Sequence, residues 1–350
     1  MTKKIRLIKY TGFFFLAAVI FSCAGSPKVQ TAPLWVTDTE KAYPDRDWLV
    51  VVEAEQDAKL AERAAVTRLA QIFRVDLVSV TNANRQFAES INGVKGKNLL
   101  ITSQSNAIAQ ELISTSAVSG LIGLQIESWA NPKGRSYANA RMNRKECSAR
   151  YSAMIRENEK VIGGLKEEAE RNPRTFEAFQ MLNLAYSFAV VTDNFHSLLT
   201  VLDLSAISRR PSYGNAEAVK SLAQSAGRSI VVTVRVNGDN SGRIEKAFTE
   251  SLNSRGFRTS AEGDNFYVLA ASFQLEDVDI KNSSNKFARY ILNYSLKDRG
   301  GVDLFSASDN GREGHLTESE ARQRAIRAAE QTIASSGFAV NFDAFLASLL

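Results

Sequence analysis

The stretch IESWANPKGRSYANARMNR, from Ile126 to Arg144, carries the clearest local signal in this chain of 350 residues. Pro132 and Gly134 lie in a short turn-like segment between two strand-like runs. Proline supplies a fixed backbone dihedral and glycine a permissive one, and a chain reversal needs both. The stretch therefore predicts a β-hairpin, with strands at 121–129 and 136–144.

The residues before this hairpin show strand and helix patterns in turn. Trp48 to Val52 is a short apolar run bounded by Pro44-Asp45 and by charged residues, as is typical of a buried strand. Residues 56–73 predict a helix, because their apolar side chains recur at helical spacing: Ala61, Ala65, Leu69, Ile72 and Phe73. Two further stretches, 74–81 and 99–112, are predicted as strands.

Several of these residues together resemble the LPP-twenty family of bacterial lipoproteins. The features that carry the resemblance are Trp35-Val36, Tyr43-Pro44, a strand leading into an alanine-rich helix, and Trp129 facing the segment 137–140 of sequence Tyr-Ala-Asn-Ala. They span residues 34–151, about a third of the chain. The resemblance implies a surface or outer-membrane lipoprotein, linked to flagella in several members and mostly without an assigned reaction. It also leads us to expect Trp129 partly buried beside Tyr137.

Residues 145–207 are predicted to be helical. One apolar stripe ends at Asn172-Pro173, because proline disfavours a helical conformation in the residue before it. A second stripe begins at Phe176, and we expect Thr192-Asp193-Asn194 to turn the chain. A membrane span is excluded by the charged and polar residues of this stretch: Glu177, Asp193, Asn194, His196 and Asp203. We expect a buried antiparallel helical hairpin packed on the first domain.

Residues 229–350 predict a second sheet. A strand at 230–236 is followed by a helix that ends near Gly256, where a left-handed cap is expected. Antiparallel strands are predicted at 266–275, 287–296 and 302–306. Thr317 and Glu320 form a capping box that opens a last helix, which runs to about Ser335. This order of elements resembles the small α/β domain of TolB amino-terminal regions and of curli-transport lipoproteins.

The predicted fold class is α+β, with two small sandwich domains whose antiparallel or mixed sheets carry helices on one face. A helical hairpin separates them. The predicted segments are a lipoprotein signal peptide at 1–22, a flexible tether at 23–33, the first domain at 34–150, the hairpin at 151–207, a looser hinge at 208–228 and the second domain at 229–350.

The N-terminus predicts where the chain resides. Four basic residues precede an apolar run of about 13 residues, which is too short for the roughly 20 that a spanning helix needs. Ile20-Phe21-Ser22-Cys23 resembles the lipobox of bacterial lipoproteins, in which the cysteine becomes the lipidated first residue. Two residues before this cysteine the lipobox usually has a small residue, and Phe21 departs from that preference. Cys23 is therefore the predicted lipidation site, with an ordinary signal peptide as the alternative.

Composition bears on the partners. Without residues 1–22 the chain carries 39 basic and 38 acidic residues, so its charge gives no case for nucleic acid. Cys147 would then be the one further cysteine of the 350-residue sequence, and we interpret it as a small buried apolar residue rather than an intermolecular link.

Few residues suggest chemistry. His196 in an apolar helix is predicted to be a packing residue, and His315 a solvated loop residue. Asp277 and Asp279 stand two apart, but Ile280 and Lys281 follow where a calcium loop would continue with oxygen ligands. We predict no catalytic residue, no metal and no cofactor, so the chain is not expected to be an enzyme.

The leading hypothesis for function is a non-catalytic module that binds other envelope proteins or belongs to an envelope or flagellum-associated structure. Its membrane contact would be the N-terminal lipid, at the outer membrane, facing the periplasm or the cell surface. The alternative is an oligomeric assembly or secretion-accessory subunit like the curli-transport lipoproteins, for which residues 104–119 would have to supply a spanning strand. A cell-wall hydrolase is the least favoured reading. Nothing indicates a small-molecule substrate.

Overall fold

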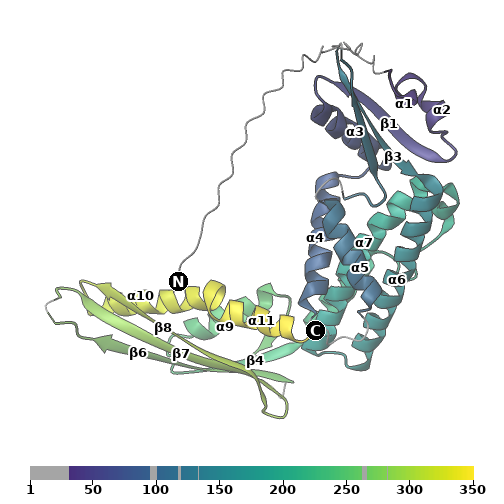
Figure 1. The fold of residues 1–350 in the computed structure, drawn as a ribbon. Coiled ribbons are helices and arrows are strands. Elements are labelled where there is room, and N and C mark those ends of the chain that lie inside the picture. Colours follow the sequence, from purple (N-terminus) through teal and green to yellow (C-terminus); the bar gives the residue numbers. More distant parts are fainter. Residues whose placement is uncertain (1–30, 95–100, 117–119, 133, 262–265, 282) are drawn as a thin grey trace, which may run out of the picture.

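The computed structural model describes residues 31–94, 101–116, 120–132, 134–261, 266–281 and 283–350. Its architecture is α+β, with two separate sheets and a group of long helices between them (Figure 1). The signal peptide, Cys23 and all of the tether before residue 31 lie outside the described residues.

The first sheet has three antiparallel strands in the order β1-β3-β2, namely β1 (Trp48–Glu55), β3 (Ser136–Asn143) and β2 (Gln125–Ala130). Helix α3 (Ala58–Phe73) packs on one face. Two short helices, α1 (Leu34–Thr37) and α2 (Thr39–Ala42), lie toward the other. Trp129 pairs with Tyr137 in register and their ring centroids are 5.8 Å apart, so the predicted contact is confirmed.

The strands predicted at 74–81 and 99–112 are wrong, because residues 77–81 and 103–112 are helical in the structure, and residues 99 and 100 lie outside the described residues. Helix α4 (Leu77–Gly93) is capped by Asp76, whose carboxylate accepts from the backbone N–H groups of Val78 and Ser79. Its buried side includes Asn84, and a polar residue among Val80, Phe87 and Ile91 hides the helical period in the sequence.

Helix α5 (Ser103–Ser116) is the second correction. Its buried residues Ser105, Ile108, Ala109 and Leu112 recur at helical spacing. The same helix removes the spanning strand that the ring-forming alternative requires, since the described part of 104–119 is helical.

Two long helices form the predicted hairpin, α6 (Arg144–Arg171) and α7 (Phe176–Leu202), and the chain turns at Asn172-Pro173 as expected. The turn predicted at Thr192-Asp193-Asn194 is wrong, because α7 continues through it. The Thr192 hydroxyl donates to the Phe188 carbonyl, 2.6 Å away, and so satisfies itself within the helix. No helix among the described residues is long and apolar enough to cross a membrane.

After η1 (Leu204–Ser208), helix α8 (Ala216–Ser229) packs along α7. Asn215 caps it by accepting from the Ala218 N–H at 2.8 Å. This helix was not predicted from the sequence, where a looser hinge was expected at 208–228. The proposed domain boundaries stay predictions.

The second sheet is mixed and has the order β5-β4-β6-β7-β8. Its strands are β4 (Val231–Asn237), β5 (Arg258–Ser260), β6 (Tyr267–Val278), β7 (Lys286–Asp298) and β8 (Asp303–His315). Strand β4 runs parallel to β5 and β6, and the others pair antiparallel. Strand β8 extends well beyond the predicted 302–306.

Helices cover one face of this sheet: α9 (Arg243–Ser254), α10 (Glu318–Gln331), the π-helix η2 (Thr332–Ser336) and α11 (Phe338–Ser348). Only half of the predicted capping box forms: the Thr317 hydroxyl accepts from the Glu320 N–H, but the Thr317 N–H donates to His315 Nδ1 and the Glu320 carboxylate bonds to Arg327. Gly256 has φ +89°, which confirms the left-handed end of α9.

Two hydrophobic cores result. The first joins β1 and β3 to α3–α7 and is mainly aliphatic, and we call this part the first unit. The second lies between the five-stranded sheet and α9–α11 and is rich in aromatic rings, and we call it the second unit. Phe176, the first residue of α7, belongs to the second core, where its ring lies 4.4 Å from Tyr267 and 5.1 Å from Phe257. One helix therefore serves both cores.

Candidate functional site

The residues singled out in the sequence lie far apart in the fold. Cys147 is buried in α6 and has no disulfide partner. Burial raises the pKa of its thiol to about 11, so the thiol stays protonated at neutral pH and the interpretation as a packing residue is confirmed by its burial. His315 ends β8, and its one hydrogen-bond partner among the described residues is Thr317, two residues further on.

The two aspartates that could suggest calcium do not act together. Asp277 forms an ion pair with Arg322 of α10, with 2.6 Å between the atoms, whereas Asp279 follows the end of β6. Within the described ranges no group of three or more His, Cys, Asp or Glu side chains is arranged to hold a metal ion.

His196 does lie in a polar cluster, which sequence reasoning missed. Its Nε2 is buried without a hydrogen-bond partner, 4.0 Å from the Glu159 carboxylate of α6. Arg209 approaches the same carboxylate at 3.9 Å. Burial lowers the pKa of His196; Glu159 and Asp193 oppose the shift and Arg209 adds to it.

Two carboxylates of this cluster hold the start of α8 on the hairpin. Asp193 accepts from the Tyr213 hydroxyl at 2.6 Å and from the Ala216 N–H at 2.8 Å. Glu159 accepts from the Ser212 N–H at 3.1 Å. These bonds explain why polar residues occur inside α6 and α7, and they assign the cluster a structural role.

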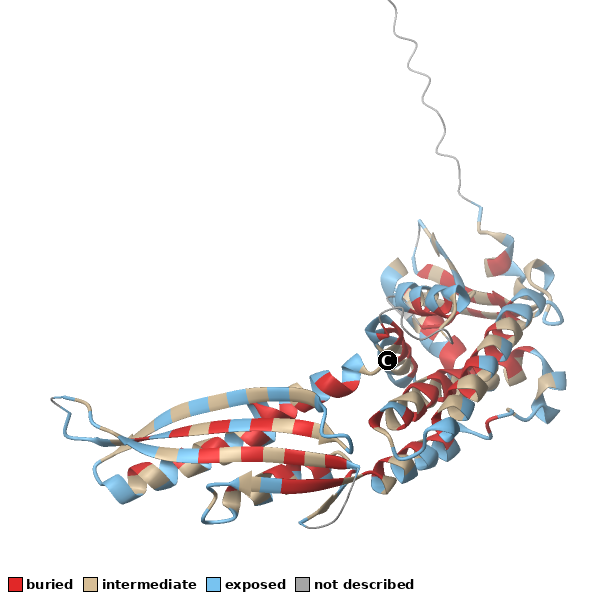
Figure 2. Cartoon of the chain, turned by 90° about the horizontal axis from the view of Figure 1, so that it is seen from below, coloured by how far each residue is buried: buried red, intermediate tan, exposed pale blue. Residues whose placement is uncertain are grey.

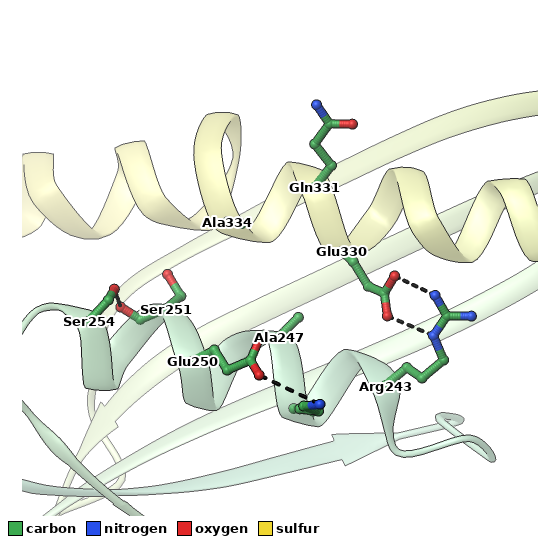
Figure 3. Close-up of a pocket in the computed structure, with 9 residues that line it drawn as sticks. Arg243, Ala247, Glu250, Ser251, Ser254, Glu330, Gln331 and Ala334 are labelled. Carbon is green, nitrogen blue, oxygen red and sulfur yellow. Dashed lines mark hydrogen bonds and ion pairs between the residues drawn. The ribbon is translucent and has the colours of Figure 1, made fainter.

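A groove between α9 and the end of α10 is the first concave surface of the second unit (Figure 3). Its volume is about 480 Å³, and its lining is polar. Arg243 closes one end by a two-pronged ion pair with Glu330, in which Nε lies 2.7 Å from Oε1. This pair raises the pKa of Arg243. Because both ends of the pair are satisfied, the groove offers no free charge there.

Local backbone structure sets the position of Arg243. Asp239 accepts from the N–H groups of Ile244 and Glu245, at 2.7 and 3.0 Å, and so caps α9 in place of the residue before it. Burial alone would raise the pKa of Asp239, yet these hydrogen bonds lower it. The π-helix η2 supplies Ala334 on the opposite wall.

A second concave surface lies on the face of the five-stranded sheet that no described helix covers. It is an open groove of about 730 Å³ over β4, β6, β7 and β8. Small polar side chains line it, including Ser272, Asn293, Ser306 and Ser308. No residue of this groove was singled out in the sequence, because a serine on an exposed strand position carries no signal of its own.

No family model matches the chain, and no curated protein matches it. Solved structures similar to it include a minor lipoprotein of Acinetobacter baumannii, with 16% identity, 32% of this chain and 94% of that one covered, and a TM-score of 0.26. A lipoprotein of Caulobacter crescentus has 13% identity over 33% of this chain and 88% of its own, with a TM-score of 0.24. A secreted protein of Helicobacter pylori has 13% identity over 83% of this chain and 98% of its own, with a TM-score of 0.36.

Proposed function

We propose that this chain is a lipid-anchored protein of the bacterial envelope that acts by binding another envelope component and not by catalysis. The support for the anchor is its N-terminal sequence, in which a basic head and a short apolar run lead to Cys23. Two or three acyl chains at such a cysteine hold a folded protein on a membrane without a spanning helix.

The observation that carries the binding role is the position of the uncovered sheet face. Helix α1, where the described chain begins, lies at one end of the molecule, and β6–β8 lie at the other (Figure 1). An anchor that precedes α1 would leave the second sheet directed away from the membrane. We therefore propose that the second unit presents a surface to a partner at a distance from the anchoring bilayer.

The non-catalytic character and the family are parts of this proposal. Its support is the dispersion of the reactive side chains, since His196, His315 and Cys147 each lie in a different place with its own local partners. The proposed LPP-twenty membership is supported by the contact of Trp129 with Tyr137. The proposed cellular location of the protein is the outer membrane.

The anchor is tested with Cys23→Ala in cells supplied with labelled palmitate. We expect the label to disappear from the protein and the unprocessed or released chain to accumulate. Density fractionation of the wild-type membranes should place the protein with the outer membrane. A Cys23→Ala protein that stays labelled and membrane-bound would refute the anchor.

The binding role is tested by photo-crosslinking in the cells that make the protein. A photoreactive residue at Ser308, on the uncovered face, should give a defined product, whereas one at Arg324, on α10, should not. Equal yields from the two positions would remove the support for a binding face on the second sheet. Size-exclusion chromatography of the purified protein in detergent distinguishes the assembly alternative, which requires a large ring.

A further inference from the structure

The second sheet has one covered and one uncovered face. Buried residues alternate with exposed or half-buried ones along β6 and β7, so that Leu269, Phe273, Leu292 and Tyr294 point toward the helices. Figure 2 shows the opposite face with no helix over it. Antiparallel sheets commonly leave one face to water, so an uncovered face is not in itself unusual.

The composition of the uncovered face is more informative. The strand registers place Ala270 beside Ser295 and Ser306, and the next row aligns Asn237, Ser272, Asn293 and Ser308. These short side chains form the floor of the groove of about 730 Å³. Serine and asparagine both donate and accept hydrogen bonds. The floor is therefore hydrophilic, and it belongs to a face whose strands of 12 and 13 residues extend for about 40 Å.

Three arginines lie on the same face, outside the residues that line the groove, whose one charged residue, Asp303, is paired with Lys297. Arg289 and Arg312 lie directly opposite each other on β7 and β8, and Arg235 lies on β4 in the row of Ala270. All three are exposed, and none forms an ion pair with another described residue, although Glu276 is opposite Arg289 in the register. Like charges directly opposite on neighbouring strands are destabilising, so this pair costs the fold free energy unless an anion lies between them.

One of the two arginines is held in position. The Arg312 guanidinium lies over the Phe287 ring, 5.6 Å from its centroid. That ring in turn lies over Gly314, where an added Cβ would be 2.6 Å from a ring carbon. A cation over an aromatic face is attracted by the ring and loses less freedom when it binds.

The charge of the face differs from that of its domain. Residues 229–350 contain 14 basic and 16 acidic residues, a net charge of −2. The uncovered face nevertheless has more basic than acidic residues, with Arg235, Arg289, Lys297 and Arg312 against Glu276 and Asp303. This segregation makes the face complementary to an anion.

We propose that the uncovered face of the second sheet binds a hydroxyl-rich envelope glycan that carries carboxylates, such as the peptide-bearing glycan of the cell wall. The serine and asparagine floor hydrogen-bonds the sugar hydroxyls and amides. Arg289 and Arg312 receive a carboxylate, for which the guanidinium fork is the matching donor. The face continues along the strands beyond the groove, so a linear polymer can lie in the groove and also reach the arginines.

A protein partner fits this face less well. The buried centres of protein interfaces are enriched in aromatic residues and methionine and depleted in serine and alanine. Here the rows at the groove consist mainly of serine, asparagine and alanine, the next row holds Ile291, and Phe287 lies toward the end of the strands. The anchoring membrane fits less well too, because the face lies at the end of the molecule opposite α1.

The test is cosedimentation of the full chain in detergent with purified peptidoglycan sacculi, with chitin as a related glycan without carboxylates. We expect the wild type to pellet with sacculi, more weakly with chitin, and less as NaCl rises from about 50 to about 300 mM. Arg289→Gln with Arg312→Gln should lower the affinity for sacculi about tenfold, which corresponds to losing about 1.4 kcal/mol.

The matched control is Arg324→Gln with Arg327→Gln, which removes the same charge from the helix side of the same domain. These side chains are exposed on α10 and pair only with Glu320. The control should bind sacculi like the wild type. Gly314→Val should displace the Phe287 ring and weaken binding together with the position of Arg312.

Three results would overturn the inference: a wild type that does not pellet with sacculi, equal losses in the two double variants, or binding to chitin as strong as to sacculi. The inference rests on the proposed function for its location in the envelope. The two proposals can be refuted independently of each other. Palmitate labelling tests the lipid anchor, and cosedimentation of the purified protein with sacculi tests glycan binding.

Discussion

Arginine occurs on the face of each sheet that lies opposite its main helices, and its surroundings differ between the two sheets. In the first sheet, Arg141 donates to Glu127 at 2.8 Å and to Gln125 at 3.2 Å, and it lies 4.8 Å from the centre of the Tyr43 ring. Its side chain is 16% exposed. In the second sheet, Arg289 and Arg312 face each other without an ion pair to another described residue, and Arg312 lies over the Phe287 ring. An arginine on a sheet face can therefore have all of its partners within the chain, as Arg141 does where α1 and α2 cover the sheet.

On the covered face of the first sheet, the polar side chains hydrogen-bond to one another. Trp35 of α1 donates from its indole nitrogen to Glu127, 3.0 Å away, and Tyr43 approaches the other oxygen of that carboxylate at 3.4 Å. Burial alone would raise the pKa of Glu127, but the bonds from Trp35 and Arg141 lower it. The polar groups of this face therefore stabilise the fold, and those of the second sheet remain available to a ligand.

The largest expected effect comes from the ring that connects the two units. Phe176→Ala should destabilise the second unit by about 3–5 kcal/mol, because a buried phenylalanine leaves a cavity when truncated. The ring packs within 5.7 Å of Phe257, Tyr267, Phe342 and Phe345. Urea unfolding followed by the amide exchange of β6 measures it. A stability change confined to the first unit would contradict the assignment of Phe176 to the second core.

Some elements of the fold could be predicted from the sequence and others could not. Strands β4, β6 and β7 were predicted nearly in full, because apolar residues alternate along them above a helix layer. Helices α4 and α5 were not, because Asn84 and Ser105 are buried on their inner sides and interrupt the apolar period. Phe176 was assigned to the hairpin, since spacing along one helix cannot tell which of two cores a terminal residue enters.

The site was even less accessible to sequence reasoning. The N-terminal signal pointed to Cys23, yet the uncovered face is made of serines, asparagines and single arginines. They converge only through the registers that align β4, β6, β7 and β8. The cluster of Glu159, Asp193 and His196 was likewise missed, because its members come from two helices.

The second prediction concerns the ion pair between Glu127 and Arg141 on the first sheet. Glu127→Gln removes the carboxylate that pairs with Arg141 and should cost about 1 kcal/mol, a modest value because the Glu127 side chain is 44% exposed. Chemical denaturation at neutral pH measures the loss. Asp47→Asn, which removes the exposed partner of Arg46, is the control and should cost less. Equal costs for the two variants would mean that the first face is no better satisfied than open surface.

The third prediction concerns the buried histidine of the first unit. The pKa of His196 is lowered in the fold, so below about pH 6.5 the unfolded chain takes up a proton that the folded chain does not. Stability should therefore decrease as the pH falls from about 7.5 through 6.5. His196→Phe should make that decrease shallower, as measured by urea unfolding at several pH values. The lowered carboxylates Glu127 and Asp239 act only in more acidic solution, so they do not obscure this window. An unchanged slope in His196→Phe would place the effect in another group.

The smallest expected effect is the most discriminating. Arg289→Gln with Arg312→Gln should change the free energy of unfolding by less than about 0.5 kcal/mol, because both side chains are exposed and neither loses an ion pair. Removing two facing like charges can even stabilise the sheet slightly. Unfolding of this double variant beside Glu127→Gln measures both faces under one set of conditions. A loss above about 1 kcal/mol would mean that the arginines support the fold as Arg141 does. A change in unfolding free energy near zero, together with reduced binding to sacculi, would show that the two faces have different roles. Arg141 would stabilise the first sheet, whereas Arg289 and Arg312 would serve binding at a small cost to the stability of the second sheet.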